Sequence, residues 1–236
     1  LRRFLLITLV LPVWTWAAPT PPTPLEQDRY RFPSQVARNG MVVSAEPLAS
    51  QAGAEVLRQG GNAVDAAVVT SLALAVTLPR AGNLGGGGFM LIRSPQGEVY
   101  ALDFRERAPS RSTADMLQDG QGNRDAQKAT IGGLCVGVPG TVAGLEMALM
   151  RFGSLSWKEA VEPARKLAEE GFLVPAWLTA EVERVATLLR RFPDSERIFF
   201  PAGQALPTGS RWLQPELAAT LALMQKRGGA GFYQGP

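Results

Sequence analysis

The chain has 236 residues, 46% of them hydrophobic and 19% charged, and 24 basic against 21 acidic side chains give a net charge of +3. This composition excludes wholesale disorder, and so small a charge excess gives no argument for a nucleic-acid partner. One cysteine and no histidine exclude a disulfide framework, thiolate or imidazole metal sites, and Ser-His-Asp or Cys-His catalysis by this chain alone, so we expect no metal site and no cofactor.

The first 18 residues have the pattern of a secretory signal peptide. Two arginines near the start precede an apolar run over residues 4–14, and small alanines follow it. The run is too short for a membrane span, although a retained anchor is the alternative interpretation. Residues 19–38 begin proline-rich and are expected to form an extended linker. The pattern predicts a periplasmic or secreted protein without a stable membrane anchor.

From residue 39 to residue 236 the sequence is that of a packed domain. A short apolar run predicts a buried strand over residues 41–44, and a proline at 47 predicts the start of a helix that ends at the glycines 60–61. Asn62 is placed to cap the next helix, over residues 63–77. This helix is rich in alanine and valine on all sides, which predicts burial between layers.

The later segments predict one hairpin, one further strand and a set of helices. Residues 89–93 and 98–104 flank a Ser-Pro-Gln-Gly turn and predict a β-hairpin, and a strand-like patch covers residues 134–138. Helices are predicted over residues 141–152, 157–170, 175–191 and 215–227, the second of them opened by a capping box. Strands early and helices late predict an α+β layered domain.

Residues 81–88 form a glycine-rich loop, Ala-Gly-Asn-Leu-Gly-Gly-Gly-Gly. Such a loop can bring backbone N–H groups to a phosphate. Here it follows a helix and enters a strand, the reverse of the dinucleotide-binding and P-loop order, and no P-loop lysine follows. The favoured interpretation is a loop that needs unusual backbone angles or close backbone contact.

The end of the second hairpin strand carries a charged cluster with a candidate binding residue. Alternation along the strand places Asp103 and Arg105 on one face and Phe104 on the other. Arg105 can clamp a carboxylate through two parallel hydrogen bonds, with Asp103 and Glu106 balancing its charge and holding the guanidinium. A local ion-pair cluster at a turn explains the same spacing, and spacing alone leaves both interpretations open.

Cys135 is interpreted as a small buried apolar residue. It lies between Leu134 and Val136, and the chain has no histidine to activate a thiol. A nucleophilic cysteine needs a basic partner. We therefore expect no catalytic role for it.

Five ordered strings resemble the opening of the γ-glutamyltransferase (glutathione hydrolase) family. The strings stand at residues 40–44, 60–67, 81–89, 103–106 and 139–144, and the resemblance covers residues 40–236 without a large gap. The family resemblance implies an N-terminal-nucleophile hydrolase fold, an αββα sandwich, with only its N-terminal part in this chain. It also implies a precursor that cleaves itself, and a new amino-terminal threonine in the small subunit that attacks the γ-glutamyl amide.

The resemblance assigns one substrate-binding residue to this chain and no catalytic residue. Arg105, in Asp-Phe-Arg-Glu, resembles the arginine that binds the α-carboxylate of the γ-glutamyl group, and Asp103 and Glu106 are at most its support. The nucleophile lies outside the chain, so we expect the fragment alone to be inactive. Its implied partners are glutathione or another γ-glutamyl compound, and the missing C-terminal part and small subunit of the same precursor.

Two other functions stay open from the sequence. An acylase acting on a glutaryl or cephalosporin-type amide can use the same scaffold, because it needs the carboxylate grip but not the amino-group contacts. If the gene ends at Pro236, the protein is instead a non-catalytic truncated remnant.

Overall fold

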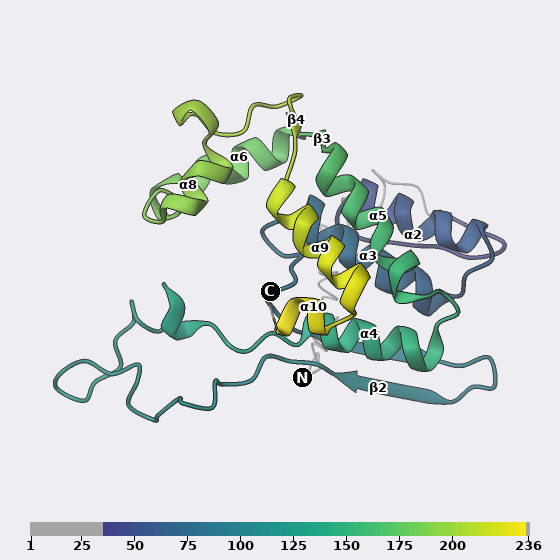
Figure 1. Ribbon diagram of the computed structural model, residues 1–236, viewed down its shortest axis with the longest axis horizontal. Coiled ribbons are helices and arrows are strands. Elements are labelled where there is room, and N and C mark those ends of the chain that lie inside the picture. Colours follow the sequence, from purple (N-terminus) through teal and green to yellow (C-terminus); the bar gives the residue numbers. More distant parts are fainter. Residues whose placement is uncertain (1–34, 235–236) are drawn as a thin grey trace, which may run out of the picture. The chain divides into compact units, whose positions relative to one another are not determined.

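The computed structural model describes residues 35–234. The predicted signal peptide over residues 1–18 and the linker up to residue 34 lie outside the described residues. From Gly40 onward the described chain belongs to one compact unit, whose ribbon is coloured along the sequence in Figure 1. Within that described part, no helix has both the length and the apolar character needed to cross a membrane.

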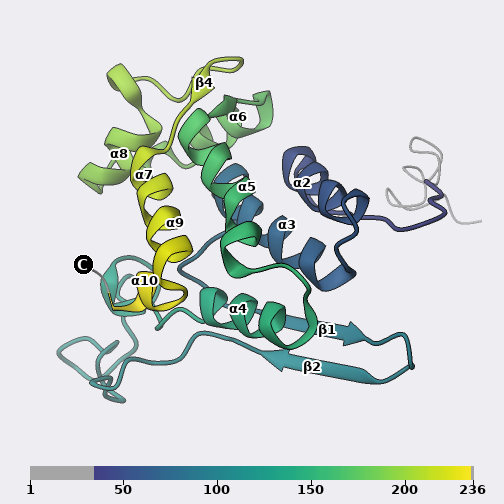
Figure 2. The ribbon, with the colours of Figure 1, turned by 45° about the vertical axis from the view of Figure 1, so that its right-hand side comes forward.

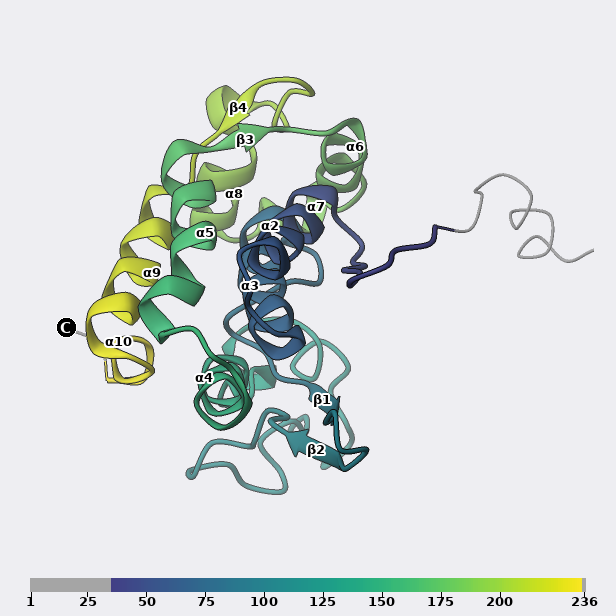
Figure 3. The same cartoon turned by 90° about the vertical axis from the view of Figure 1, so that its right-hand side faces the viewer.

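Two helices open the unit, α2 (Pro47–Arg58) and α3 (Ala63–Thr77), at the predicted positions. α3 begins with a capping box: Asn62 accepts hydrogen bonds from the N–H groups of Val64 and Asp65, and the Asp65 side chain accepts one from the Asn62 N–H. α3 packs against α2, α4 (Thr141–Phe152) and α5 (Trp157–Glu170), so it lies between helical layers (Figure 3). The predicted burial is confirmed, because its apolar residues on several sides are fully buried: Val68, Val69, Leu72, Ala73 and Val76.

The β-hairpin is also confirmed. β1 (Phe89–Arg93) pairs antiparallel with β2 (Val99–Asp103), and Phe89 lies opposite Asp103. One face, with Leu102 buried, packs toward α4, which lies along the hairpin in Figure 2. The other face carries Phe89, Leu91 and Val99, which are 67%, 77% and 67% exposed. No described element covers this apolar face.

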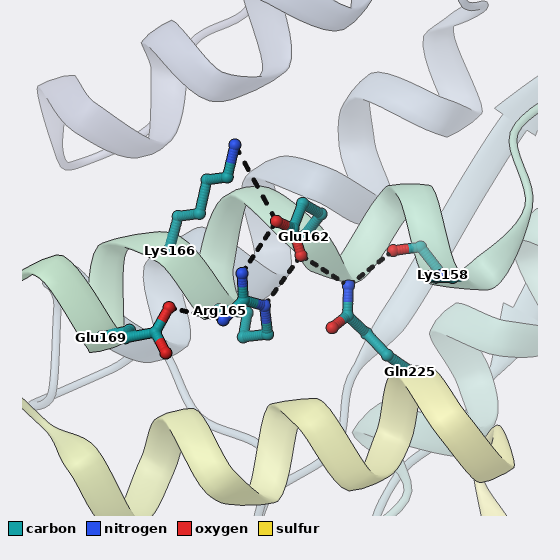
Figure 4. A network of polar contacts seen from close by, with 6 residues as sticks. All are labelled: Lys158, Glu162, Arg165, Lys166, Glu169 and Gln225. Atoms are coloured by element: carbon teal, nitrogen blue, oxygen red, sulfur yellow. Dashed lines mark hydrogen bonds and ion pairs between the residues drawn. The ribbon is translucent and has the colours of Figure 1, made fainter.

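A second layer of helices covers α3. α5 packs between α3 and α9 (Pro215–Arg227), and the short α10 (Ala230–Tyr233) follows α9. Figure 4 shows the polar contacts on this layer: Glu162 pairs with Arg165, Arg165 reaches Glu169, and Gln225 of α9 donates to Glu162 Oε2 at 2.8 Å. The Arg165 guanidinium is the main reason that the pKa of Glu162 falls to about 2. The cluster is partly exposed, so its ion pairs contribute little to stability, and Gln225 is the residue that links it to α9.

The predicted helix over residues 175–191 is wrong in its length. It is two helices, α6 (Ala176–Arg184) and α7 (Ala186–Leu189), because Val185 leaves the helical region at φ −107° and ψ 13°. The break lets Ala186 and Leu189 turn onto the core that α6 also covers. This end of the unit is completed by α8, two short strands and a 3₁₀ turn: β3 (Phe172–Leu173), α8 (Pro193–Phe199), Pro201–Gly203 and β4 (Arg211–Trp212).

Two predicted strands and one burial prediction are wrong. Residues 41–44 form no strand, since no other described segment pairs with them. Residues 134–138 contain a 3₁₀ turn (Gly133–Cys135) and a single bridge between Val138 and Arg107. Cys135 is exposed, and its thiol donates only to the Gly132 carbonyl at 3.0 Å. An apolar run is buried only where another layer of the structure covers it, and no described layer covers the segment around Cys135.

Candidate binding site

The glycine-rich loop lies against the end of β2 and the start of α4. Gly88 and Phe104 exchange backbone hydrogen bonds of 3.3 and 3.0 Å, and the N–H groups of Gly140 and Thr141 both donate to the Gly86 carbonyl. A Cβ atom on Gly87 would lie 2.5 Å from the Phe104 carbonyl oxygen. The prediction of close backbone contact is therefore confirmed, and the loop positions a strand end.

Phe104 anchors that strand end. A Cβ atom on Gly144 of α4 would lie 2.2 Å from Phe104 Cγ, so the ring packs directly on the helix backbone. Because Phe104 faces inward, the residues on either side of it, Asp103 and Arg105, are exposed. The predicted alternation is confirmed.

The Arg105 side chain is 61% exposed and lines a cavity of about 280 Å³. Its Nε lies 3.3 Å from Glu106 Oε2, and its guanidinium carbon lies 6.0 Å from the centre of the Phe89 ring. Within residues 35–234 the guanidinium donates no hydrogen bond. Glu106 thus contacts the guanidinium at its Nε, and the remaining N–H groups stay available for a planar anion.

Asp103 and Glu106 take different positions around Arg105. Glu106 Oε2 is buried, accepts no hydrogen bond from a described residue and has the Arg105 Nε as its ion-pair partner. Asp103 Oδ1 instead accepts the backbone N–H of Arg105 at 3.0 Å. Glu106 therefore lies against the guanidinium as expected, whereas Asp103 fixes the backbone that presents it.

Two further residues had no role in the sequence prediction: Arg107, which lines this cavity, and Tyr233, which hydrogen-bonds two of the lining residues. Arg107 lines the cavity beside Arg105, and its backbone is held by hydrogen bonds of 3.2 and 2.7 Å with Val138. The Tyr233 hydroxyl donates to the Pro139 carbonyl at 3.0 Å and accepts the Ala143 N–H at 3.1 Å. The spacing of two from Arg105 was a signal for Arg107. Nothing local indicates Tyr233, which lies 90 residues from its partner Ala143.

A metal-ligand cluster is not present in this part of the chain. Residues 35–234 contain no group of three or more histidine, cysteine, aspartate or glutamate side chains that can hold an ion. The arrangement at the strand end can bind a carboxylate through a guanidinium. It brings no nucleophile to the cavity, whose polar side chains are Asp103, Arg105 and Arg107.

A strand-end arginine with free donors lies on a small cavity, an arrangement that can bind a carboxylate. Residues 49–236 match the family model described as Gamma-glutamyltranspeptidase, and the chain belongs to this family. It is 44% identical over 220 residues to the glutathione hydrolase proenzyme of Escherichia coli, which covers 93% of this chain and 38% of that protein.

Solved structures agree with this assignment. The γ-glutamyltranspeptidase of Helicobacter pylori is 41% identical with a TM-score of 0.83, over 86% of this chain and 58% of that one. A cephalosporin acylase from Bacillus halodurans is 31% identical with a TM-score of 0.71, over 87% of this chain and 40% of that one. The predicted α+β fold of the N-terminal-nucleophile hydrolase type is therefore confirmed. The chain spans well under half the length of its E. coli relative.

Proposed function

We propose that the precursor containing this chain hydrolyses γ-glutamyl compounds such as glutathione, or transfers their γ-glutamyl group to an amino acid or peptide. Arg105 binds the α-carboxylate of the glutamyl group, and the nucleophilic threonine comes from the rest of the precursor. The observation that carries the proposal is the exposed guanidinium on the cavity, which donates no hydrogen bond to another described residue. The glutathione hydrolases among the relatives support the substrate class.

The same proposal assigns the chain its place in a larger assembly. The signal-peptide pattern over residues 1–18 supports export to a periplasm or the medium, and residues 39–236 supply part of the large subunit. The apolar face of the hairpin, with Phe89, Leu91 and Val99 exposed, supports a contact with the remaining part of the precursor.

The proposed carboxylate clamp is tested with Arg105→Ala in the full-length precursor. Losing one or two charge-assisted hydrogen bonds should raise KM for a γ-glutamyl anilide about 10- to 100-fold, and Arg105→Lys should restore only part of it because it lacks the fork. Arg111→Ala is the control, since Arg111 is exposed and does not line the cavity. An unchanged KM in Arg105→Ala would refute the clamp.

An acylase is the second candidate function, and the similarity to the Bacillus halodurans cephalosporin acylase favours it. A glutaryl amide presents a carboxylate to Arg105 but no α-amino group. Comparing matched γ-glutamyl and glutaryl anilides separates the two functions. A higher kcat/KM for the glutaryl anilide would replace the γ-glutamyl proposal with the acylase.

A further inference from the structure

A second arginine lines the cavity on which Arg105 lies. Arg107 is exposed, and its guanidinium forms no ion pair or hydrogen bond with any residue between 35 and 234. Arg105, by contrast, has Glu106 beside it at 3.3 Å. Of the two cations at this cavity, Arg107 is therefore the one without a counter-charge in the described chain.

The backbone presents both arginines in the same direction. Residues two apart in an extended chain share a face, and their Cα atoms lie about 6.5 Å apart. The bridge from Arg107 to Val138 holds this extended conformation beyond the end of β2, with hydrogen bonds in both directions. The inward packing of Phe104 and the half-burial of Glu106 fit the same alternation. The side chains of Arg105 and Arg107 are thus expected on the same side of the chain, and both residues line the cavity.

One cation at the cavity has no anion beside it. The lining contains two arginines and one carboxylate, Asp103, which already accepts a backbone hydrogen bond, and the neighbouring Glu106 pairs with Arg105 and not with Arg107. Two cations held on one face repel each other, and a ligand with two separated carboxylates relieves this repulsion. A ligand with a single carboxylate leaves one guanidinium without a partner.

We propose that Arg107 binds a second carboxylate of the donor, one that belongs to the leaving group beyond the scissile amide. This inference rests on the proposed function of Arg105, and it deepens that function by naming the substrate class. The site then favours γ-glutamyl peptides that end in a free carboxylate over donors whose leaving group is neutral. Arg107 sets this preference and takes no part in bond cleavage.

The test compares two donors that differ only in this charge, glutathione and its carboxamide at the glycine end. In the full-length precursor, Arg107→Met keeps the apolar stem and removes the charge. We expect KM for glutathione to rise about tenfold, KM for the carboxamide to stay within about twofold, and kcat to change little with either donor. Arg107→Lys should recover part of the loss, and Arg111→Met is the matched control outside the cavity.

The outcomes separate this inference from the proposed function. An equal shift of KM for both donors, or no shift for either, overturns the role of Arg107. Arg105→Ala, in contrast, must raise KM for glutathione and carboxamide alike, because both carry the α-carboxylate. Failure of that second result refutes the clamp at Arg105 even where Arg107→Met discriminates between the donors.

Discussion

Asp65 is a fully buried carboxylate that joins the start of α3 to the loop between α4 and α5. Its two oxygens accept hydrogen bonds from the Asn62 N–H, the Ser154 N–H and hydroxyl, and the Leu155 N–H, at 2.7 to 3.1 Å. Burial alone would raise the pKa of Asp65, but these hydrogen bonds outweigh it and hold the pKa below its usual value. The folded protein therefore stabilises the ionised form of Asp65.

Replacing Asp65 with asparagine tests this role. The lowered pKa means that the ionised carboxylate contributes its full stability above about pH 4, and loses it as the pH falls through the folded-state pKa. Asp65→Asn puts an N–H₂ group against N–H donors and should cost about 2–4 kcal/mol at pH 7. Urea unfolding in dilute solution should show that the difference from wild type shrinks toward pH 3.

Asp194→Asn is the control for this prediction, because the Asp194 side chain is 90% exposed and its ion pair with Arg197 is long, at 3.5 Å. We expect it to change the free energy of unfolding by less than about 0.5 kcal/mol. An Asp65→Asn deficit of the same size at pH 3 and pH 7 would contradict the ionisation argument.

At the scale of elements, α4 and the end of β2 are joined through glycine. Gly140 and Gly144 leave no room for a Cβ atom, which would lie 2.0 Å from the Phe104 carbonyl oxygen and 2.2 Å from Phe104 Cγ. Phe104 directly precedes Arg105 in the chain. The close approach of α4 to the end of β2 thus requires glycine at positions 140 and 144, and the position of the Arg105 guanidinium depends on this approach.

Gly144→Ala tests this coupling. The new methyl group must push the strand end away from α4, which should destabilise the protein by about 1–3 kcal/mol and raise KM for a γ-glutamyl donor several-fold. Thermal unfolding and steady-state kinetics of the full-length precursor measure the two effects. Gly85→Ala, in the glycine-rich loop over residues 81–88, has open space around its Cβ position and should change neither. Equal effects from both variants would show that the contact with Phe104 is not the cause.

At the scale of the whole molecule, the described chain has an apolar face but no nucleophile at its cavity. The isolated 236-residue chain should give no turnover of a γ-glutamyl anilide, because the role proposed for Arg105 is to bind the substrate and the described cavity holds no nucleophile. Measurable release of the aniline by the purified chain would contradict the assignment of the chemistry to the rest of the precursor. The full-length precursor is the positive control.

The exposed face of the hairpin also predicts how the isolated chain behaves in solution. Leu91 is 77% exposed between Phe89 and neighbouring apolar residues, so Leu91→Glu should reduce self-association by placing a charge in the patch. Light scattering at equal concentration measures this. Met150→Glu, at a residue of α4 that is 79% exposed, is the control and should have a smaller effect. In the precursor, Leu91→Glu should instead lower the yield of processed enzyme.

Local signals in the sequence determined α2, α3, α4, α5, α9 and the hairpin, because caps, turn residues and periodicity act within a few residues of each other. They also determined the strand end that presents Arg105. The family followed from ordered motifs, and the relatives confirm it.

Only the tertiary structure decided which apolar segments are buried and which residues line the cavity together. The segments over 41–44 and 134–138 have strand-like sequences, but the first has no pairing partner in the described chain and the second pairs only through the bridge between Val138 and Arg107. Cys135 is exposed because no described layer covers it. Arg107 is held at the cavity by its bridge to Val138, 31 positions away, and Tyr233 bonds to the lining residues Pro139 and Ala143 from 90 or more positions away. Burial and hydrogen-bond pairing depend on these distant neighbours, which no short stretch of sequence contains.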